Sequence, residues 1–229
     1  MSRRCAICGG SAFKFAPVLW AGLIAEWRLS PDEADYVDRQ QGECCATCGG
    51  NLRSILLARM ICQALDRPEP LATLVPTLAD IKILEINEAG TLSPILRTAP
   101  AHTFGAYPEV DMHALPYGDQ SFDIVVHSDT LEHVEHPVRA LAECRRVLKL
   151  GGACCFTVPV IVGRLSASRE GLPPSYHGDP TLCAEDQLVR TEFGADLWTY
   201  LARARFDHIE VSTLDFPSAT AWMGRRLST

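Results

Sequence analysis

Two copies of one cysteine pattern offer the clearest chemistry in this sequence. Cys5 and Cys8 form a Cys-x-x-Cys pair, Cys45 and Cys48 form a second, and two glycines follow each pair. Four thiolates brought together in a tetrahedron are the usual ligands of a structural Zn²⁺ ion. Glycines after the second cysteine let the backbone turn and direct its amides at the sulfurs. The sequence therefore predicts a structural zinc site made by these four cysteines.

Two alternatives to this assignment stay open at the level of sequence. Cys44 lies directly before Cys45 and could take its place as a ligand. The cysteines could instead be buried or redox-active thiols, although a redox pair would not need a second copy. Disulfides are not expected, because we expect a cytoplasmic protein.

A second candidate site lies in the segment "LEINEAGTLSP", residues 84–94. We expect a strand to end at Ile86 and a helix to begin near Pro94. Many α/β enzymes place a glycine-rich cofactor loop at such a position. This loop has one glycine, Gly90, so the sequence predicts either a modified site or the remains of one.

The elements that must position these residues change character along the chain. Residues 1–66 read as a small, mostly helical zinc-binding module, in which Ser30 and Pro31 open a helix. The proline-rich stretch 67–80 reads as a connector. From residue 81 apolar strand patterns alternate with helical patterns, which predicts a mainly parallel sheet covered on both faces. The stretch 159–190, rich in Pro, Gly and Ser, interrupts the alternation as a long loop of the kind that often carries function.

Overall composition narrows the classes of function. The chain has 229 residues, 47% of them hydrophobic, and a net charge of -7. The negative charge disfavours nucleic acid as a partner, because phosphate contacts need Lys and Arg. No apolar run is long enough for a membrane span, and the first residues lack the apolar core of a secretory signal. We therefore expect no membrane association and a cytoplasmic location.

The run "DMHALPYGDQSFDIVVHSDTLEHVEHPVRALAECRRVLKLGGACCFTVP", residues 111–159, closely resembles the core of class I S-adenosylmethionine-dependent methyltransferases of the type 11-like group. The resemblance implies a Rossmann-like, doubly wound, mainly parallel seven-stranded sheet, with a last strand that looks short here. It also implies S-adenosylmethionine as the cofactor, at the carboxyl ends of the first strands. The paired cysteines look like a zinc module that some of these enzymes carry.

The resemblance assigns cofactor contacts to the loop after the first strand. Glu85 keeps the family's leading acid and could orient the cofactor's ammonium group. Asn87 and Ala89 stand at usual glycine places, and Gly90 is displaced by one position. Asn tolerates a left-handed backbone and Ala is small, so we expect a modified but working loop.

Further contacts are implied along the next two strands. The family's acid for the ribose hydroxyls is missing at Gly105 or Ala106, and Glu109 is the nearest acid. Asp111 matches the position that contacts the adenine amino group, unless it is only a turn acid, and Met112 could pack on the ring. The cofactor's sulfonium is expected beside the residues after the central strand: His127, Ser128 and Asp129.

The sequence identifies the residues near the methyl acceptor less specifically than those near the cofactor. His177, in "YHGDP", and His133, in "LEH", are candidate bases for a hydroxyl acceptor, although either could be structural. The resemblance implies methyl transfer to a small-molecule acceptor: a sugar, a glycan or a natural-product intermediate. The alternatives are a non-catalytic, zinc-stabilised binding or assembly protein and, disfavoured by charge, an RNA methyltransferase.

Overall fold

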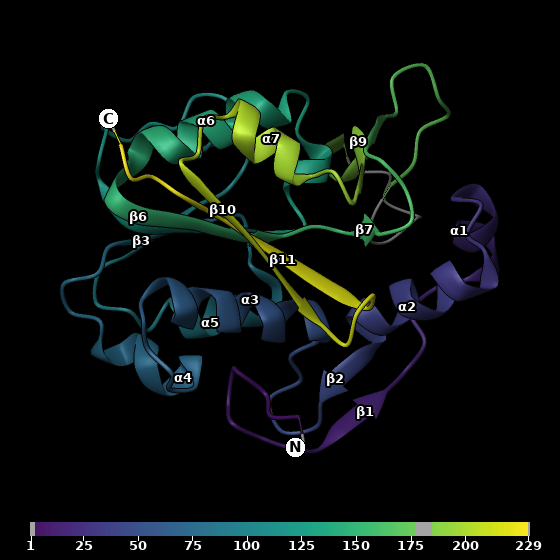
Figure 1. The fold of residues 1–229 in the computed structure, drawn as a ribbon, viewed down its shortest axis with the longest axis horizontal. Coiled ribbons are helices and arrows are strands. Elements are labelled where there is room, and N and C mark those ends of the chain that lie inside the picture. The colour runs from purple at the N-terminus through teal and green to yellow at the C-terminus, as the bar shows by residue number, and fades with distance from the viewer. Residues whose placement is uncertain (1–2, 177–184, 229) are drawn as a thin grey trace.

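A six-stranded sheet runs through the middle of the molecule (Figure 1). In this computed structural model, residues 3–176 and 185–228 are described. Across the sheet the strands are β10 (His208–Leu214), β11 (Ala219–Arg225), β6 (Leu148–Thr157), β5 (Phe122–Ser128), β3 (Ile83–Ile86) and β4 (His102–Gly105). Strands β4, β3, β5 and β6 are parallel, and β11 and β10 follow as antiparallel neighbours. Strand order reverses between β3 and β5, where α/β proteins bind ligands at the strand carboxyl ends.

This sheet confirms the predicted Rossmann-like α/β class and differs from the expectation in two details. It has six strands rather than seven within the described ranges. Beyond β4, residues 106–121 run as turns, and Pro108 and Pro116 in this stretch cannot donate ladder hydrogen bonds. The last strand, expected to be short, is the full-length β11, which pairs with both β6 and β10.

Helices cover both faces of the sheet. Figure 1 shows α6 (Pro137–Val147) and α7 (Trp198–Arg203) on one face. On the other lie α3 (Leu52–Ala64), α4 (Leu71–Leu74) and α5 (Ser93–Leu96). Alternate residues of β5 separate accordingly: Ile124 and Val126 join the cluster under α3, and Val125 joins the cluster under α6. None of the described helices is long and apolar enough to cross a bilayer.

The helix α3 comes from the first third of the chain and yet packs on the central sheet. Nearly all of its side chains are buried, and Leu56 and Met60 are 0% exposed. One continuous apolar cluster joins α3, the buried Cys5 and Cys45, and sheet residues such as Val126. The domain limits at residues 66 and 80 stay a prediction. Helix α3 and the cysteines nevertheless belong to the layer that covers the central sheet.

The rest of the N-terminal segment forms a small hairpin and two helices. Strands β1 (Phe13–Phe15) and β2 (Glu43–Cys45) pair antiparallel. Helix α1 (Ala21–Glu26) precedes α2 (Pro31–Gly42), whose capping box confirms the predicted helix start. The side chain of Ser30 accepts from the Glu33 N–H, and the Glu33 carboxylate accepts from the Ser30 N–H.

The long loop 159–190 folds against this N-terminal segment. It contains β7 (Val160–Ile161) and β8 (Ala167–Ser168), which pair with β9 (Thr191–Gly194) in a three-stranded sheet. Arg164 forms a bidentate ion pair with Glu33 at 2.8 Å and also donates to the Trp27 carbonyl. Gln40 in α2 donates to the Val160 carbonyl. These contacts fix α1 and α2 beside the carboxyl ends of the central strands.

Candidate cysteine cluster and cofactor pocket

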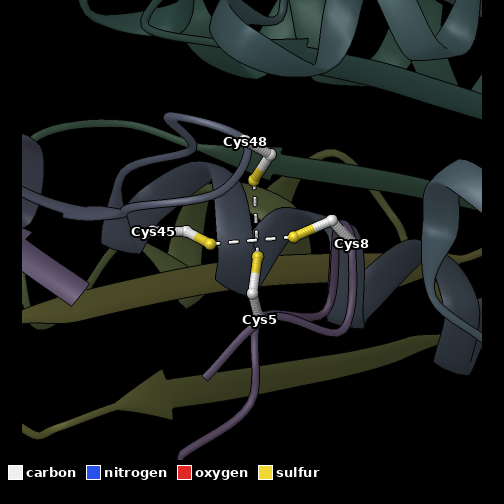
Figure 2. Close-up of side chains that lie close together, drawn as sticks. All are labelled: Cys5, Cys8, Cys45 and Cys48. Atoms are coloured by element: carbon white, nitrogen blue, oxygen red, sulfur yellow. Dashed lines mark hydrogen bonds between the residues drawn. The ribbon is translucent and has the colours of Figure 1, made fainter. Parts of the chain in front are cut away.

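The four predicted cysteines converge on one point (Figure 2). The Cys5 and Cys48 sulfurs are 3.7 Å apart, as are those of Cys8 and Cys45, and all four lie within 4.8 Å of one another. Zn–S bonds of about 2.3 Å in a tetrahedron place sulfurs about 3.8 Å apart. The residues present therefore fit a structural Zn²⁺ ion.

The backbone around each pair forms a matching turn. Gly9 and Gly49 both adopt a positive φ, near 80°, which glycine adopts without strain. The Gly10 N–H points at the Cys8 sulfur at 3.4 Å. Cys44 lies outside the cluster, because its thiol donates to the Gln41 carbonyl instead. The geometry thus places Cys45, and not its neighbour Cys44, in the four-sulfur cluster.

A cavity of about 820 Å³ opens at the carboxyl ends of the parallel strands. The residues that follow β3, β4 and β5 form one wall, and the opposite wall comes from the N-terminal segment and the loop after β7. Among the described residues, five of those predicted for the site line it: Asn87, Asp111, Met112, Asp129 and His133. This volume and this position suit a nucleoside-sized cofactor together with an acceptor.

The loop after β3 is held by a buried acid. Glu85 is 0% exposed; one carboxylate oxygen accepts from the Ala89 N–H at 2.9 Å, and the other is 2.8 Å from His102 Nε2. Glu85, Ala89 and Gly90 do not line the cavity. Their contribution in the structure is to shape the loop, and a direct cofactor contact from them stays a prediction.

Asn87 carries the loop into the cavity. Its φ is 55°, the left-handed conformation that asparagine tolerates better than most residues. Its side-chain oxygen accepts from the Tyr107 N–H at 3.0 Å, which ties the end of β3 to the segment after β4. The polar side chain therefore replaces a glycine while bracing the pocket wall.

Asp111 and Met112 stand together on that wall. The Asp111 carboxylate accepts from the backbone N–H of His113 and from its ring Nδ1, both at 2.8 Å, and the backbone bond in particular lowers the pKa of Asp111. His113 Nε2 accepts from the His136 N–H, so Nδ1 carries the proton. Met112 is 4% exposed and offers a thioether surface to a flat ring. An ionised acceptor beside an apolar side chain suits an adenine amino group and its ring.

Gly105, one of the two positions at which the ribose acid is missing, has no room for a side chain. Gly105 ends β4, and a Cβ there would lie 2.8 Å from Val110 Cγ2 and 2.9 Å from the Tyr117 hydroxyl. An aspartate cannot enter this space without moving both neighbours. Glu109, the nearest acid, is exposed and does not line the cavity.

We therefore expect Gly105→Asp to destabilise the protein rather than to improve cofactor binding. Overpacking of this kind costs about 1–3 kcal/mol, and a buried unpaired carboxylate adds to that cost. Thermal unfolding followed by circular dichroism should show a fall of several degrees. The control is Gly163→Asp, where an added Cβ meets nothing within 4 Å. Equal melting temperatures for the two variants would contradict the steric account.

The residues at the carboxyl end of β5 divide between the cavity and the core. Asp129 lines the cavity and has a φ of 50°. His127 is 0% exposed and stacks on Phe156 at 4.6 Å, and burial lowers the pKa of His127 to about 4. Ser128 is also buried and bonds to the Thr157 hydroxyl. The structure thus brings only Asp129 of these three to the pocket surface.

Of the two candidate bases, only His133 lies within the described residues. His133 lines the cavity, and its Nδ1 donates to the Leu188 carbonyl at 3.1 Å. This bond braces the loop before β9, as a structural role would require, and makes Nε2 the basic nitrogen of the neutral ring. His177 lies outside the described residues.

Several cavity residues escaped the sequence patterns. Arg53 lies in the first turn of α3, and Arg190 lies directly before β9. Trp20 and Trp27 come from the N-terminal segment. Residue type alone favours a buried place for a tryptophan, yet Trp20 is 44% exposed. Arg53 has no distinguishing sequence signal, because Arg59 is a second cation in the same mainly apolar helix.

Comparisons with known proteins agree with this geometry. Residues 92–156 match the methyltransferase domain family. A 52-residue stretch is 42% identical to 2-methyl-6-phytyl-1,4-hydroquinone methyltransferase 1, chloroplastic, of Oryza sativa subsp. japonica. A 64-residue stretch is 36% identical to a protein named as a probable S-adenosylmethionine-dependent methyltransferase of Mycolicibacterium smegmatis.

These matches are local. They cover 23% and 26% of this chain, which spans only 16% and 25% of the two relatives. A solved structure from Thermotoga maritima, described as an S-adenosylmethionine-dependent methyltransferase and possible histamine N-methyltransferase, is 19% identical. The match covers 67% of this chain and 86% of the Thermotoga maritima chain, with a TM-score of 0.40. The family match covers most of the segment that carries the sequence resemblance, and residues 92–156 are therefore similar to a methyltransferase domain.

Proposed function

We propose that this protein is an S-adenosylmethionine-dependent methyltransferase that acts on a small molecule. The observation that carries the proposal is the cavity at the strand carboxyl ends, with Asp111 and Met112 on its wall. When bound, the cofactor supplies a methyl group from its sulfonium, and the leaving group is a neutral thioether. The protein's own task is then to align the two reactants and exclude water.

The residues in the cavity can divide this task. Asp111 would accept from the adenine amino group and Met112 would cover one face of the ring. Asn87 and Asp129, at the ends of β3 and β5, would hold the polar tail. His133 Nε2 would take the proton of a hydroxyl acceptor, and His177, which lies outside the described residues, stays the alternative base.

We infer that the acceptor lies beside the N-terminal segment. Trp20, Leu23 and Trp27 line the cavity from α1 and its flanks, and Tyr176 lines it from the loop after β8. Aromatic walls of this kind suit the apolar face of a sugar or the ring of a natural product. We propose that the methyl acceptor is a sugar, a glycan or a natural-product intermediate.

We also propose that Cys5, Cys8, Cys45 and Cys48 hold a structural Zn²⁺ ion. Four thiolates leave no open coordination position, so the ion would stabilise the fold and take no part in methyl transfer.

Calorimetric titration with S-adenosylhomocysteine tests the cofactor assignment. We expect micromolar binding by the wild type and about tenfold weaker binding by Asp111→Asn, which weakens a hydrogen bond to a charged group. Asp119→Asn is the control, because Asp119 is an exposed acid paired with Arg146 outside the cavity. Absence of binding at millimolar concentration would refute the enzyme and favour a non-catalytic binding protein. The absence of an acid at Gly105 and at Ala106 is the observation that keeps this second candidate.

A further inference from the structure

Arg53 is a buried cation on the cavity wall. It is 3% exposed, and its Nη1 lies 3.0 Å from the Asp129 carboxylate. Both residues line the cavity, Arg53 from the first turn of α3 and Asp129 from the end of β5. The ion pair therefore joins the N-terminal segment to the central strand where the polar tail of a ligand would lie.

The bonding of this guanidinium is incomplete. The group has five N–H donors, and Nε has no hydrogen-bond partner within residues 3–176 and 185–228. A cation in the first turn of a helix also lies at the positive end of the helix dipole, which destabilises it. Asp129 provides one anion for this buried charge, but the Nε donor stays unpaired, and a buried unpaired donor is costly. A negatively charged ligand in the cavity would pair with that donor and offset the helix dipole.

The position of Arg53 is fixed from two sides. The second cysteine pair leads through Gly50 into Asn51, whose side chain caps α3 by accepting from the Ser54 N–H at 2.8 Å. A Cβ on Gly50 would lie 2.3 Å from Ile7 Cδ1, so the two cysteine turns meet closely there. A Cβ on Gly50 would also lie 3.6 Å from Thr91 in the loop after β3. The first turn of α3 is thus held between the cysteine cluster and the cofactor loop.

We propose that Arg53 binds the α-carboxylate of the cofactor's methionine part, with Asp129 beside its ammonium group. The inference rests on the proposed function. The methionine part is a zwitterion that carries both charges on one carbon, and an arginine paired with an aspartate presents the complementary charges. A guanidinium matches a carboxylate with two parallel N–H bonds, which a lysine cannot do.

Two nucleosides separate this role from general damage to the pocket. S-adenosylhomocysteine carries the amino-acid group, and 5′-methylthioadenosine keeps the adenosine and thioether without it. We expect Arg53→Met to weaken S-adenosylhomocysteine about 10- to 100-fold in calorimetry, the effect of losing hydrogen bonds to a charged group. Binding of methylthioadenosine should stay within about twofold of the wild type. Arg59→Met is the matched control, because Arg59 lies on the same helix and does not line the cavity.

Each result decides the inference. Selective loss of S-adenosylhomocysteine supports it, whereas unchanged binding of that ligand, or equal loss of both, overturns it. If Arg53→Met does not fold, Arg53→Lys is judged by the same selectivity, because it keeps the charge and loses the planar fork. A wild-type protein that binds methylthioadenosine and S-adenosylhomocysteine equally well overturns the inference alone. A wild-type protein that binds neither overturns the proposed function as well.

Discussion

Replacing Cys45 by serine should lower the bound zinc below one ion per chain. The variant should already be unfolded at physiological temperature, so that heating shows no cooperative unfolding transition. Binding of structural zinc is itself folding free energy, about 10–16 kcal/mol in small zinc peptides. A domain's whole stability is about 5–15 kcal/mol. Because Cys45 is 0% exposed and belongs to the cluster that includes α3, its loss would also loosen the cover of the central sheet. Zinc content by mass spectrometry and thermal unfolding by circular dichroism would measure both effects.

The neighbouring cysteine provides the control. Cys44→Ser changes the same atom one residue earlier, but the Cys44 thiol lies outside the four-sulfur cluster. This variant should keep about one zinc per chain and a melting temperature within about 2 °C of the wild type. A Cys45→Ser protein that retains one zinc and melts with the wild type would disprove the metal assignment. Equal damage from both substitutions would show that the two thiols act alike.

Glu85→Ala should have the second largest effect, through the loop that it shapes. The substitution removes a buried carboxylate and leaves both of its partners, the Ala89 N–H and the His102 ring, without that hydrogen bond. Leaving a buried polar group unsatisfied in this way costs about 1–3 kcal/mol for each group. The loop should then lose its turn, and binding of S-adenosylhomocysteine should fall at least tenfold although Glu85 does not line the cavity. Denaturant unfolding and calorimetry would give the two values.

Glu88, an exposed acid three residues after Glu85, is the control for this prediction. Glu88 is 72% exposed and pairs with the exposed Arg97, so Glu88→Ala should change stability by no more than about 0.5 kcal/mol. The interpretation of Glu85 as a loop-shaping residue fails if its alanine variant is as stable as the Glu88 variant. It also fails if stability falls while binding at a temperature well below the transition is unaffected.

The features predictable from sequence are those with strong local signals. The apolar run 122–127 appears as β5, the start of α2 has the predicted capping box, and the repeated cysteine pattern closes into one cluster. Each depends on neighbours in sequence or on one stringent chemical requirement. Asp111 and Met112 reach the cavity because they lie in the segment that resembles the family.

What could not be predicted depends on contacts between distant segments. The pattern of α3 shows an apolar helix and cannot say which surface it covers, so its place on the central sheet was missed. Glu85 was expected in the site because its type fits an ammonium group, whereas its burial is set by His102 on the next strand. The tryptophans of the N-terminal segment line the cavity because the loop after β7 holds that segment in place.

The place of α3 bears on how the chain is made. A ribosome releases this helix before any strand of the sheet that it covers, so its apolar side has no partner at first. Early metal capture would order the cysteine turns at its start while the helix waits for β11, the last strand of the sheet to be synthesised. Between the synthesis of α3 and that of β6 the newborn chain thus exposes an apolar surface, which favours aggregation.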